Sequence, residues 1–168
     1  MSNIENLYNI LFKKNIILPS NIEHEISFSL TDSLHLNNHI SFIIDKTTKN
    51  VLAYGFNYYL KSNKFPFSLH SEINTINKYY KKKLNKNTIK CKKILLIFKV
   101  TKTGIIGNSR PCQNCVNFIL NNYNNLNLNK IYYSYKENLL KELSKENLLY
   151  GDFTISSGFR KSYRGCKN

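Results

Sequence analysis

The sequence lacks several features that would place the chain in a special class. None of its 168 residues belongs to an apolar run of about 18 or more, so no part of it is expected to span a membrane. The stretch Met1 to Lys14 has no charged region followed by an apolar region and a small-residue cleavage site, which predicts a cytoplasmic protein, with the nucleus as the other location. No internal repeat and no linker interrupts the chain, so we expect one domain over residues 1–168.

Acidic residues are scarce. Only 10 Asp and Glu stand against 25 Lys and Arg, which gives a formal charge of +15. A field of this size attracts polyanions such as nucleic acids. Arginine, the better residue for bidentate phosphate contacts, is also scarce, and Lys, Asn, Ile and Tyr are abundant, as AT-rich coding would produce. Two interpretations therefore stay open, a functional polyanion surface and an effect of composition alone.

Cysteines are few as well, at positions Cys91, Cys112, Cys115 and Cys166. A disulfide framework is not expected in a chain of this size without a signal peptide. Cys112 and Cys115 form a C-x-x-C pair, which indicates metal or redox chemistry in a reducing compartment. Cys91 and Cys166 are expected to be incidental thiols.

The hydropathy pattern predicts alternating helices and strands. Helical periodicity covers residues 4–14, 69–83, 112–122 and 136–149, and strand patterns cover 40–44, 51–56, 94–100 and 131–135. The strand over 94–100 is expected to be buried on both faces. This order of elements indicates an α/β layered domain.

Two motifs at the starts of predicted helices carry the chemistry: H-S-E at 70–72 and P-C-Q-N-C at 111–115. His70, Cys112 and Cys115 supply the three protein ligands of a catalytic zinc ion, whose fourth position holds water. Cysteines at i and i+3 share one helix face, and a helix N-terminus favours the thiolate form. Glu72 is placed to move protons for a water that zinc activates. A structural zinc or a redox pair is the alternative for the cysteines, but it would not need Glu72.

An H-x-E motif followed by P-C-x-x-C is the signature of zinc nucleobase deaminases. Over residues 40–135 the chain resembles the cytidine and deoxycytidylate deaminase superfamily, which includes tRNA adenosine deaminases and nucleic-acid-editing cytidine deaminases. The resemblance covers Y-G-F-N at 54–57, L-H-S-E-I-N-T-I at 69–76, residues 109–115 and I-Y-Y-S at 131–134, in that order. It implies a three-layer domain, with helices on both faces of a five-stranded mixed sheet and zinc between the N-termini of two helices.

The resemblance also implies substrate contacts. Asn57 would hydrogen-bond the ribose or deoxyribose, the backbone around Ser71 would contact the base edge, and Arg110, ahead of Pro111, would offer its carbonyl to the amine. Ser71 stands where the family usually has Ala, and Arg110 stands where subfamilies differ, so the substrate class stays open. The orientation of the fifth strand separates the free-cytidine branch from the others, and the helical pattern of 136–149 favours a helical crossover and so a parallel strand.

The activity expected from the sequence is hydrolytic deamination of cytosine in a nucleoside or nucleotide, by attack of hydroxide on C4 with Glu72 as the proton shuttle. The alternatives are a deaminase of cytosine or adenine within RNA or single-stranded DNA, and a catalytically silent, zinc-stabilised nucleic-acid-binding or accessory subunit. The apolar stretches are also compatible with self-association.

Some basic and histidine residues stay outside the motif. A Lys–Tyr run over 78–93 is either a nucleic-acid contact or a solvated helix end and loop. In the tail, phosphate or nucleic-acid contacts are expected at Arg160, Lys161 and Arg164. The other histidines are expected at the surface or behind the metal ligands, and they are His24, His35 and His39.

Overall fold

A computed structural model of the chain describes residues 5–20, 22, 25, 37–60, 67–82, 90–101, 105–136 and 139–154. Along the chain the elements are α1 (Glu5–Lys13), β1 (Asn37–Asp45), β2 (Val51–Phe56), β3 (Tyr58–Leu60), β4 (Phe67–Leu69), α3 (Ser71–Lys81), β5 (Lys93–Thr101), β6 (Ile106–Gly107), α5 (Gln113–Asn122), β7 (Leu128–Ser134), β8 (Leu140–Leu143) and α6 (Lys145–Tyr150). The longest of these helices, α3, has 11 residues, and no helix in the described ranges is long and apolar enough to cross a membrane.

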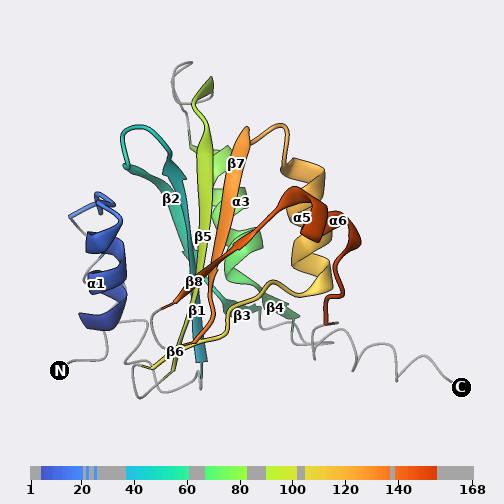
Figure 1. Cartoon of the computed structure of the whole chain (residues 1–168), viewed down its shortest axis with the longest axis horizontal. Helices are drawn as coiled ribbons and strands as arrows, with labels where there is room; N and C mark the ends of the chain where they lie inside the picture. Colours follow the sequence, from blue (N-terminus) through green and yellow to red (C-terminus); the bar gives the residue numbers. More distant parts are fainter. Residues whose placement is uncertain are drawn as a thin grey trace, which may run out of the picture.

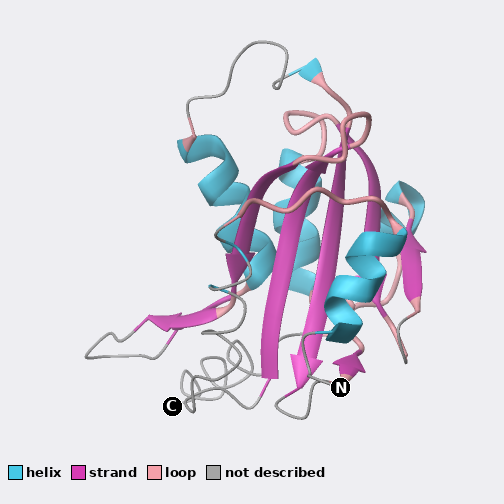
Figure 2. Ribbon diagram, turned by 90° about the vertical axis from the view of Figure 1, so that its left-hand side faces the viewer, coloured by secondary structure: helices cyan, strands magenta, loops and turns pink. Residues whose placement is uncertain are grey.

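One mixed sheet organises the fold (Figure 2). Its strands lie in the order β2-β1-β5-β7-β8, and the short β6 pairs with the end of β5. Strand β1 runs antiparallel to β2 and to β5, β5 runs parallel to β7, and β8 runs antiparallel to β7. Strands β3 and β4 form a separate hairpin. The α/β class and the five-stranded mixed sheet predicted from the sequence are confirmed.

Helices cover both faces of the sheet (Figure 1), with α1 on one side and α3 and α5 on the other. The central strand β5 supplies both cores. Leu95 and Ile97 pack into the core with α3 and α5, whereas Leu96 and Phe98 pack into the core with α1. Because both faces of a central strand are covered, its sequence is a continuous apolar run rather than an alternating one. The prediction for residues 94–100 is confirmed.

The helix predicted over 136–149 does not form as such, and the prediction of a parallel fifth strand is wrong. Only residues 135–139 separate β7 from β8, and across this connection Tyr135 N donates to Leu139 O at 2.8 Å. A connection this short can only join antiparallel neighbours, and α6 comes after β8. The spacing of Leu140 and Leu143 caused the error, because residues three apart share a face in a helix but lie on opposite faces in a strand. Here Leu140 packs on the α1 side and Leu143 on the other.

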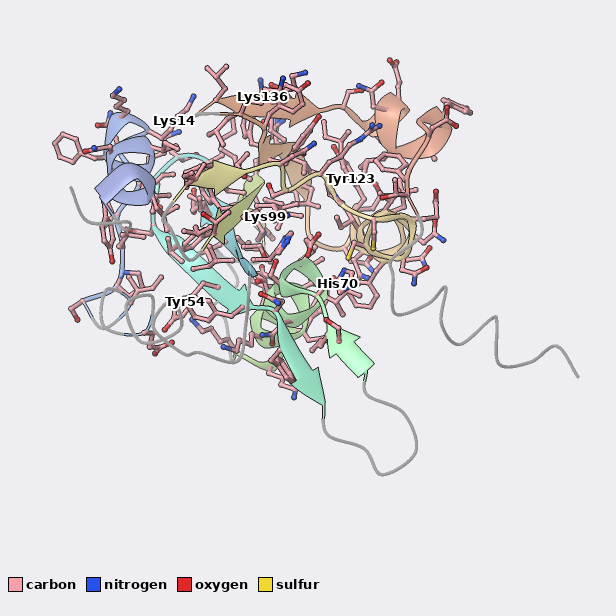
Figure 3. All side chains as sticks on the ribbon, turned by 90° about the horizontal axis from the view of Figure 1, so that it is seen from below. Lys14, Tyr54, His70, Lys99, Tyr123 and Lys136 are labelled. Carbon is pink, nitrogen blue, oxygen red and sulfur yellow. The ribbon has the colours of Figure 1, made fainter. Side chains whose placement is uncertain are left out.

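The two motif-bearing helices begin at the same end of the sheet, which Figure 3 shows end-on. Helix α3 approaches β2 closely at Gly55, where a Cβ atom would lie 2.8 Å from Thr75 Oγ1 and 2.9 Å from Thr75 N. Only glycine allows this approach, since real Cβ contacts are not this short. Gly55 therefore helps to set where the first turn of α3 lies.

Candidate metal centre

Three potential ligand atoms converge where α3 and α5 begin. His70 caps α3 and Cys112 caps α5, and neither side chain makes a capping hydrogen bond. His70 Nδ1 lies 3.2 Å from Cys115 Sγ and 3.4 Å from Cys112 Sγ. Together the three residues place one ligand atom each within 4.8 Å of the others, so this group could hold a metal ion. Figure 3 shows sulfur atoms next to His70.

The start of α5 differs slightly from the prediction. Cys112 lies just before the helix rather than inside it, and Pro111 lies one residue further out. Cys115 lies in the first turn and is fully buried. The two sulfurs therefore come from different elements, that of Cys112 from the loop before α5 and that of Cys115 from the helix itself.

The pKa values of the two cysteines are shifted in opposite directions. A hydrogen bond with Cys115 lowers the pKa of Cys112 to about 4, and a further hydrogen bond with His70 acts in the same direction against the effect of burial. The same bond to Cys112, followed by burial, raises the pKa of Cys115 well above its usual value. The pKa of Cys112 is thus lowered and that of Cys115 raised, so an ion held by both sulfurs would have to displace a proton from the pair.

Glu72 is a buried carboxyl group beside these ligands. It is 3 % exposed, and Ser71 Oγ donates to its Oε2 at 3.1 Å. Burial raises the pKa of Glu72 above its ordinary value, although the charge of His70 opposes this. Its charge in turn contributes to the raised pKa of Cys115, which places the carboxylate next to the ligand group. A carboxyl group with a raised pKa next to a metal site is suited to taking up and releasing protons.

Hydrogen bonds fasten α3 to the sheet next to His70. Thr75 Oγ1 donates to Ser71 O at 2.8 Å and lies 2.7 Å from Ser41 Oγ on β1. Asn74 Nδ2 donates to Phe56 O, the last residue of β2, at 2.8 Å. The first turn of α3, which carries His70 and Glu72, is thus tied to two strands.

A serine pair fastens the loop that leads into α5. Ser109 Oγ donates to Ile97 O at 2.7 Å, Ser109 N donates to Ser134 O at 2.8 Å, and Ser134 N donates to Ser109 Oγ at 2.8 Å. Ser109 lies three residues before Cys112, so these bonds join the cysteine loop to β5 and β7. Ser109 belongs to the stretch 109–115 that carries the family resemblance, but its anchoring role could not be predicted from that stretch.

Asn57 and His39 bridge the ends of β1 and β2 near the ligands. His39 N donates to Asn57 Oδ1 at 2.6 Å, and Asn57 N donates to His39 O at 3.0 Å. With Oδ1 engaged, Nδ2 is the group that Asn57 can offer to a ligand. Burial, and after it the charge of Lys99, lowers the pKa of His39 to about 4. His70 and Cys112 also affect this pKa, so His39 lies near the metal ligands.

His39 should remain neutral in the folded protein at mildly acidic pH. The unfolded chain binds a proton at this imidazole below about pH 6.5, whereas the folded chain does so only near pH 4. The free energy of unfolding should therefore fall by up to about 1.4 kcal/mol per pH unit as the pH drops through this window. An NMR titration of the histidine ring protons would measure the pKa, and Lys99→Met should raise it. A His39 pKa near 6.5 in the folded protein would contradict this prediction.

Lys99 is a site residue that the sequence analysis missed. It pairs in register with His39 on the neighbouring strand, it is half-buried, and its side chain lies across Gly107. Figure 3 shows Lys99 and His70 close to the middle of the end view. A signal was present in the sequence, because Lys99 is in phase with Leu95 and Ile97, which face the same side of β5.

Of the remaining predicted substrate contacts, Ser71 and Arg110 lie in the described ranges and the tail residues do not. Ser71 is fully buried against Glu72, and Arg110 is exposed with its guanidinium 4.7 Å from the centre of the Phe153 ring. The tail residues Arg160, Lys161 and Arg164 lie outside the described ranges, as do His24 and His35.

The described part of the Lys–Tyr run lies far from the ligands. Tyr79 is 4 % exposed and belongs to the core, and Lys93 is fully buried. The run begins at Lys78 in the last turn of α3, roughly 12 Å along the helix from His70 at 1.5 Å per residue. Tyr79 is therefore not available to stack on a base.

Comparison with protein-family models, with curated proteins and with solved structures finds no match to this chain.

Proposed function

We propose that the chain is a zinc-dependent hydrolytic deaminase of a nucleobase, converting cytosine to uracil in a nucleoside or nucleotide. The observation that carries the proposal is the buried carboxyl group of Glu72 next to a three-ligand group of His70, Cys112 and Cys115. The order of the motifs, H-x-E and then P-C-x-x-C, supports it because zinc nucleobase deaminases share this signature.

The ligand group suits zinc. Imidazole nitrogen and thiolate sulfur are the donors that Zn²⁺ prefers, at about 2.0–2.1 Å and 2.3 Å, which puts the nitrogen and a sulfur roughly 3.5 Å apart in a tetrahedral site. The distances of 3.2 and 3.4 Å from His70 Nδ1 to the two sulfurs agree within a few tenths of an ångström. Within the described ranges no fourth His, Cys, Asp or Glu joins the group. A site with three protein ligands leaves a position open, as catalytic zinc sites do.

Each residue then has a task in the reaction. When bound, zinc would supply the Lewis acidity that makes a water nucleophilic at neutral pH. Glu72 would take one proton from that water and deliver it to the ring nitrogen. It would then carry the remaining hydroxyl proton to the amine, which leaves as ammonia while the carbonyl forms at C4. Asn57 Nδ2 would orient the sugar, and the free N–H groups at the start of α3, around Ser71, would face the base.

A catalytically silent accessory subunit is the main competing function. Such a protein would need the zinc ligands for stability, but it would gain nothing from a buried, raised-pKa carboxyl group beside them, because burying that group costs stability. A redox role for the cysteines is disfavoured by His70, whose ring nitrogen lies against both sulfurs. The deaminase proposal uses all four groups.

Ammonia release by the purified protein, with its zinc content determined on the same sample, tests the proposal. The substrates would be cytidine, deoxycytidine, their 5′-monophosphates, cytosine-containing single-stranded DNA and RNA, and an adenosine-containing anticodon stem-loop. We expect release from a cytosine nucleoside or nucleotide. Release from a polymer alone would favour the nucleic-acid alternative, and none at about one zinc per chain would favour the accessory subunit.

A further inference from the structure

The only arginine in the described ranges stands at the edge of the metal site. Arg110 lies two residues before Cys112, its backbone N donates to Asn108 Oδ1 at 3.0 Å, and its side chain is exposed. The guanidinium lies 4.7 Å from the centre of the Phe153 ring. Stacking on an aromatic ring restricts a flexible side chain while leaving its N–H groups free to donate. The other basic residues that the structure describes are lysines, so among them this position alone has the planar side chain suited to bidentate anion binding.

The Phe153 ring is itself held in place by the segment that follows α6. Thr154 O accepts a hydrogen bond of 3.0 Å from Gln113 N, the first residue of α5. Gly151 N donates to Asn147 O at 2.9 Å, and Phe153 packs against the core shared with α3 and α5. Figure 1 shows this segment running down beside α5 towards the end where the helix begins. The segment therefore delivers Phe153 to Arg110 from a distant part of the chain.

The charges around Arg110 leave it ready for an external anion. The ion pair that the structure records within the described ranges joins Lys130 and Glu142, and it does not involve Arg110. Asp152 is next to Phe153 but forms no ion pair with Arg110. Helix α5 has no acidic residue in its first turn, so the positive end of its dipole is not offset there. Lys99 adds a second positive charge near the same ligands.

We propose that Arg110, positioned by Phe153, binds a phosphate group of the substrate, so that the site acts on a phosphorylated cytosine nucleoside, either free or within a strand. This inference rests on the proposed function and names its substrate class. Arg110 would contact the phosphate directly, and Phe153 would act as a positioning residue that holds the guanidinium flat. The base would lie at the zinc site while Arg110 binds the phosphate at the other end of the same nucleotide.

Kinetics with matched substrates test the proposal. Arg110→Met should lower kcat/KM for cytidine 5′-monophosphate by about 10- to 100-fold, mainly through KM, because a charge-assisted hydrogen bond to phosphate is lost. The loss for cytidine should be much smaller, because cytidine has no phosphate and the substitution keeps the backbone carbonyl of residue 110. Phe153→Ala should lower kcat/KM for the monophosphate by about 10-fold, and Phe153→Tyr should restore it. Lys145→Met is the control, because Lys145 also lies over an aromatic ring, 5.2 Å from Tyr123, but at the opposite end of α5. Lys145→Met should leave kcat/KM unchanged for both substrates.

Calorimetric binding to the zinc-loaded protein separates this proposal from the proposed function. If no substrate is deaminated, the deaminase proposal fails, but tighter binding of cytidine 5′-monophosphate than of cytidine that disappears in Arg110→Met would still support the phosphate site. A single-stranded oligonucleotide that shows the Arg110 effect when the monophosphate does not would place the phosphate within a strand. Equal loss for both nucleosides, phosphorylated or not, or no preference for phosphate in the wild-type protein, would overturn the inference.

Discussion

Glu72→Gln should lower deamination by about 10²- to 10⁴-fold while zinc stays bound. Gln has the size of Glu and can still accept from Ser71 Oγ, but it cannot carry protons between water, ring nitrogen and leaving amine. The lost rate corresponds to about 3–5 kcal/mol of barrier. Folding should not suffer, because the neutral amide escapes the desolvation that raises the pKa of the buried carboxyl group. We therefore expect an inactive protein with an equal or higher melting temperature.

Three measurements on one preparation check this result: ammonia release, zinc per chain and thermal unfolding. Glu146→Gln is the matched control, because Glu146 also lies in the first turn of a helix but is exposed on α6. It should keep full activity. A Glu72→Gln protein that deaminates at the wild-type rate would remove Glu72 from the mechanism.

Cys115→Ser should abolish both metal binding and turnover. Cys115 is fully buried in the ligand group, and serine is a poor replacement for a thiolate ligand of zinc. The variant should also lose the stabilisation that bound metal contributes, about 3–4 kcal/mol at a free zinc concentration of 100 to 1,000 times its dissociation constant. Chelation of the wild-type metal should have the same effect, and added zinc should reverse it. Cys91→Ser, at a half-buried thiol outside the ligand group, should keep metal and activity.

Metal binding should also release protons. The pKa of Cys112 is lowered and that of Cys115 is raised by the bond between them, so the pair must give up a proton before both sulfurs bind an ion as thiolates. Because release of one proton accompanies binding, the apparent affinity should rise by up to about tenfold per pH unit near neutrality. Calorimetry in buffers of different ionisation enthalpy measures the number of protons. Full metal occupancy in Cys115→Ser, or no proton release, would show that the ligand set is different.

Much of the candidate site could be predicted from the sequence because it depends on local spacing. Two cysteines three residues apart can reach one ion, and the first N–H groups of a helix have no intrahelical partners. His70 and Cys112 lie at helix starts as predicted, and Cys115 joins them. The hairpin of β1 and β2 and the buried strand β5 were also predictable, since their patterns have a clear length and boundary.

What the tertiary structure decided concerns residues that are distant in the sequence. The antiparallel β8 follows from the short connection to β7 and from the face of the sheet on which each leucine of β8 packs. The spacing of these leucines is compatible with a helix as well as a strand, so periodicity alone could not predict the strand. His39 and Lys99 come to the ligands only because β1 and β5 pair in this register. Phe153 reaches Arg110 only because the chain after α6 returns to the start of α5. The metal ligands could be predicted from local spacing. His39, Lys99 and Phe153 could not, because their contacts depend on strand register and on the path of the chain after α6, which exist only in the folded protein.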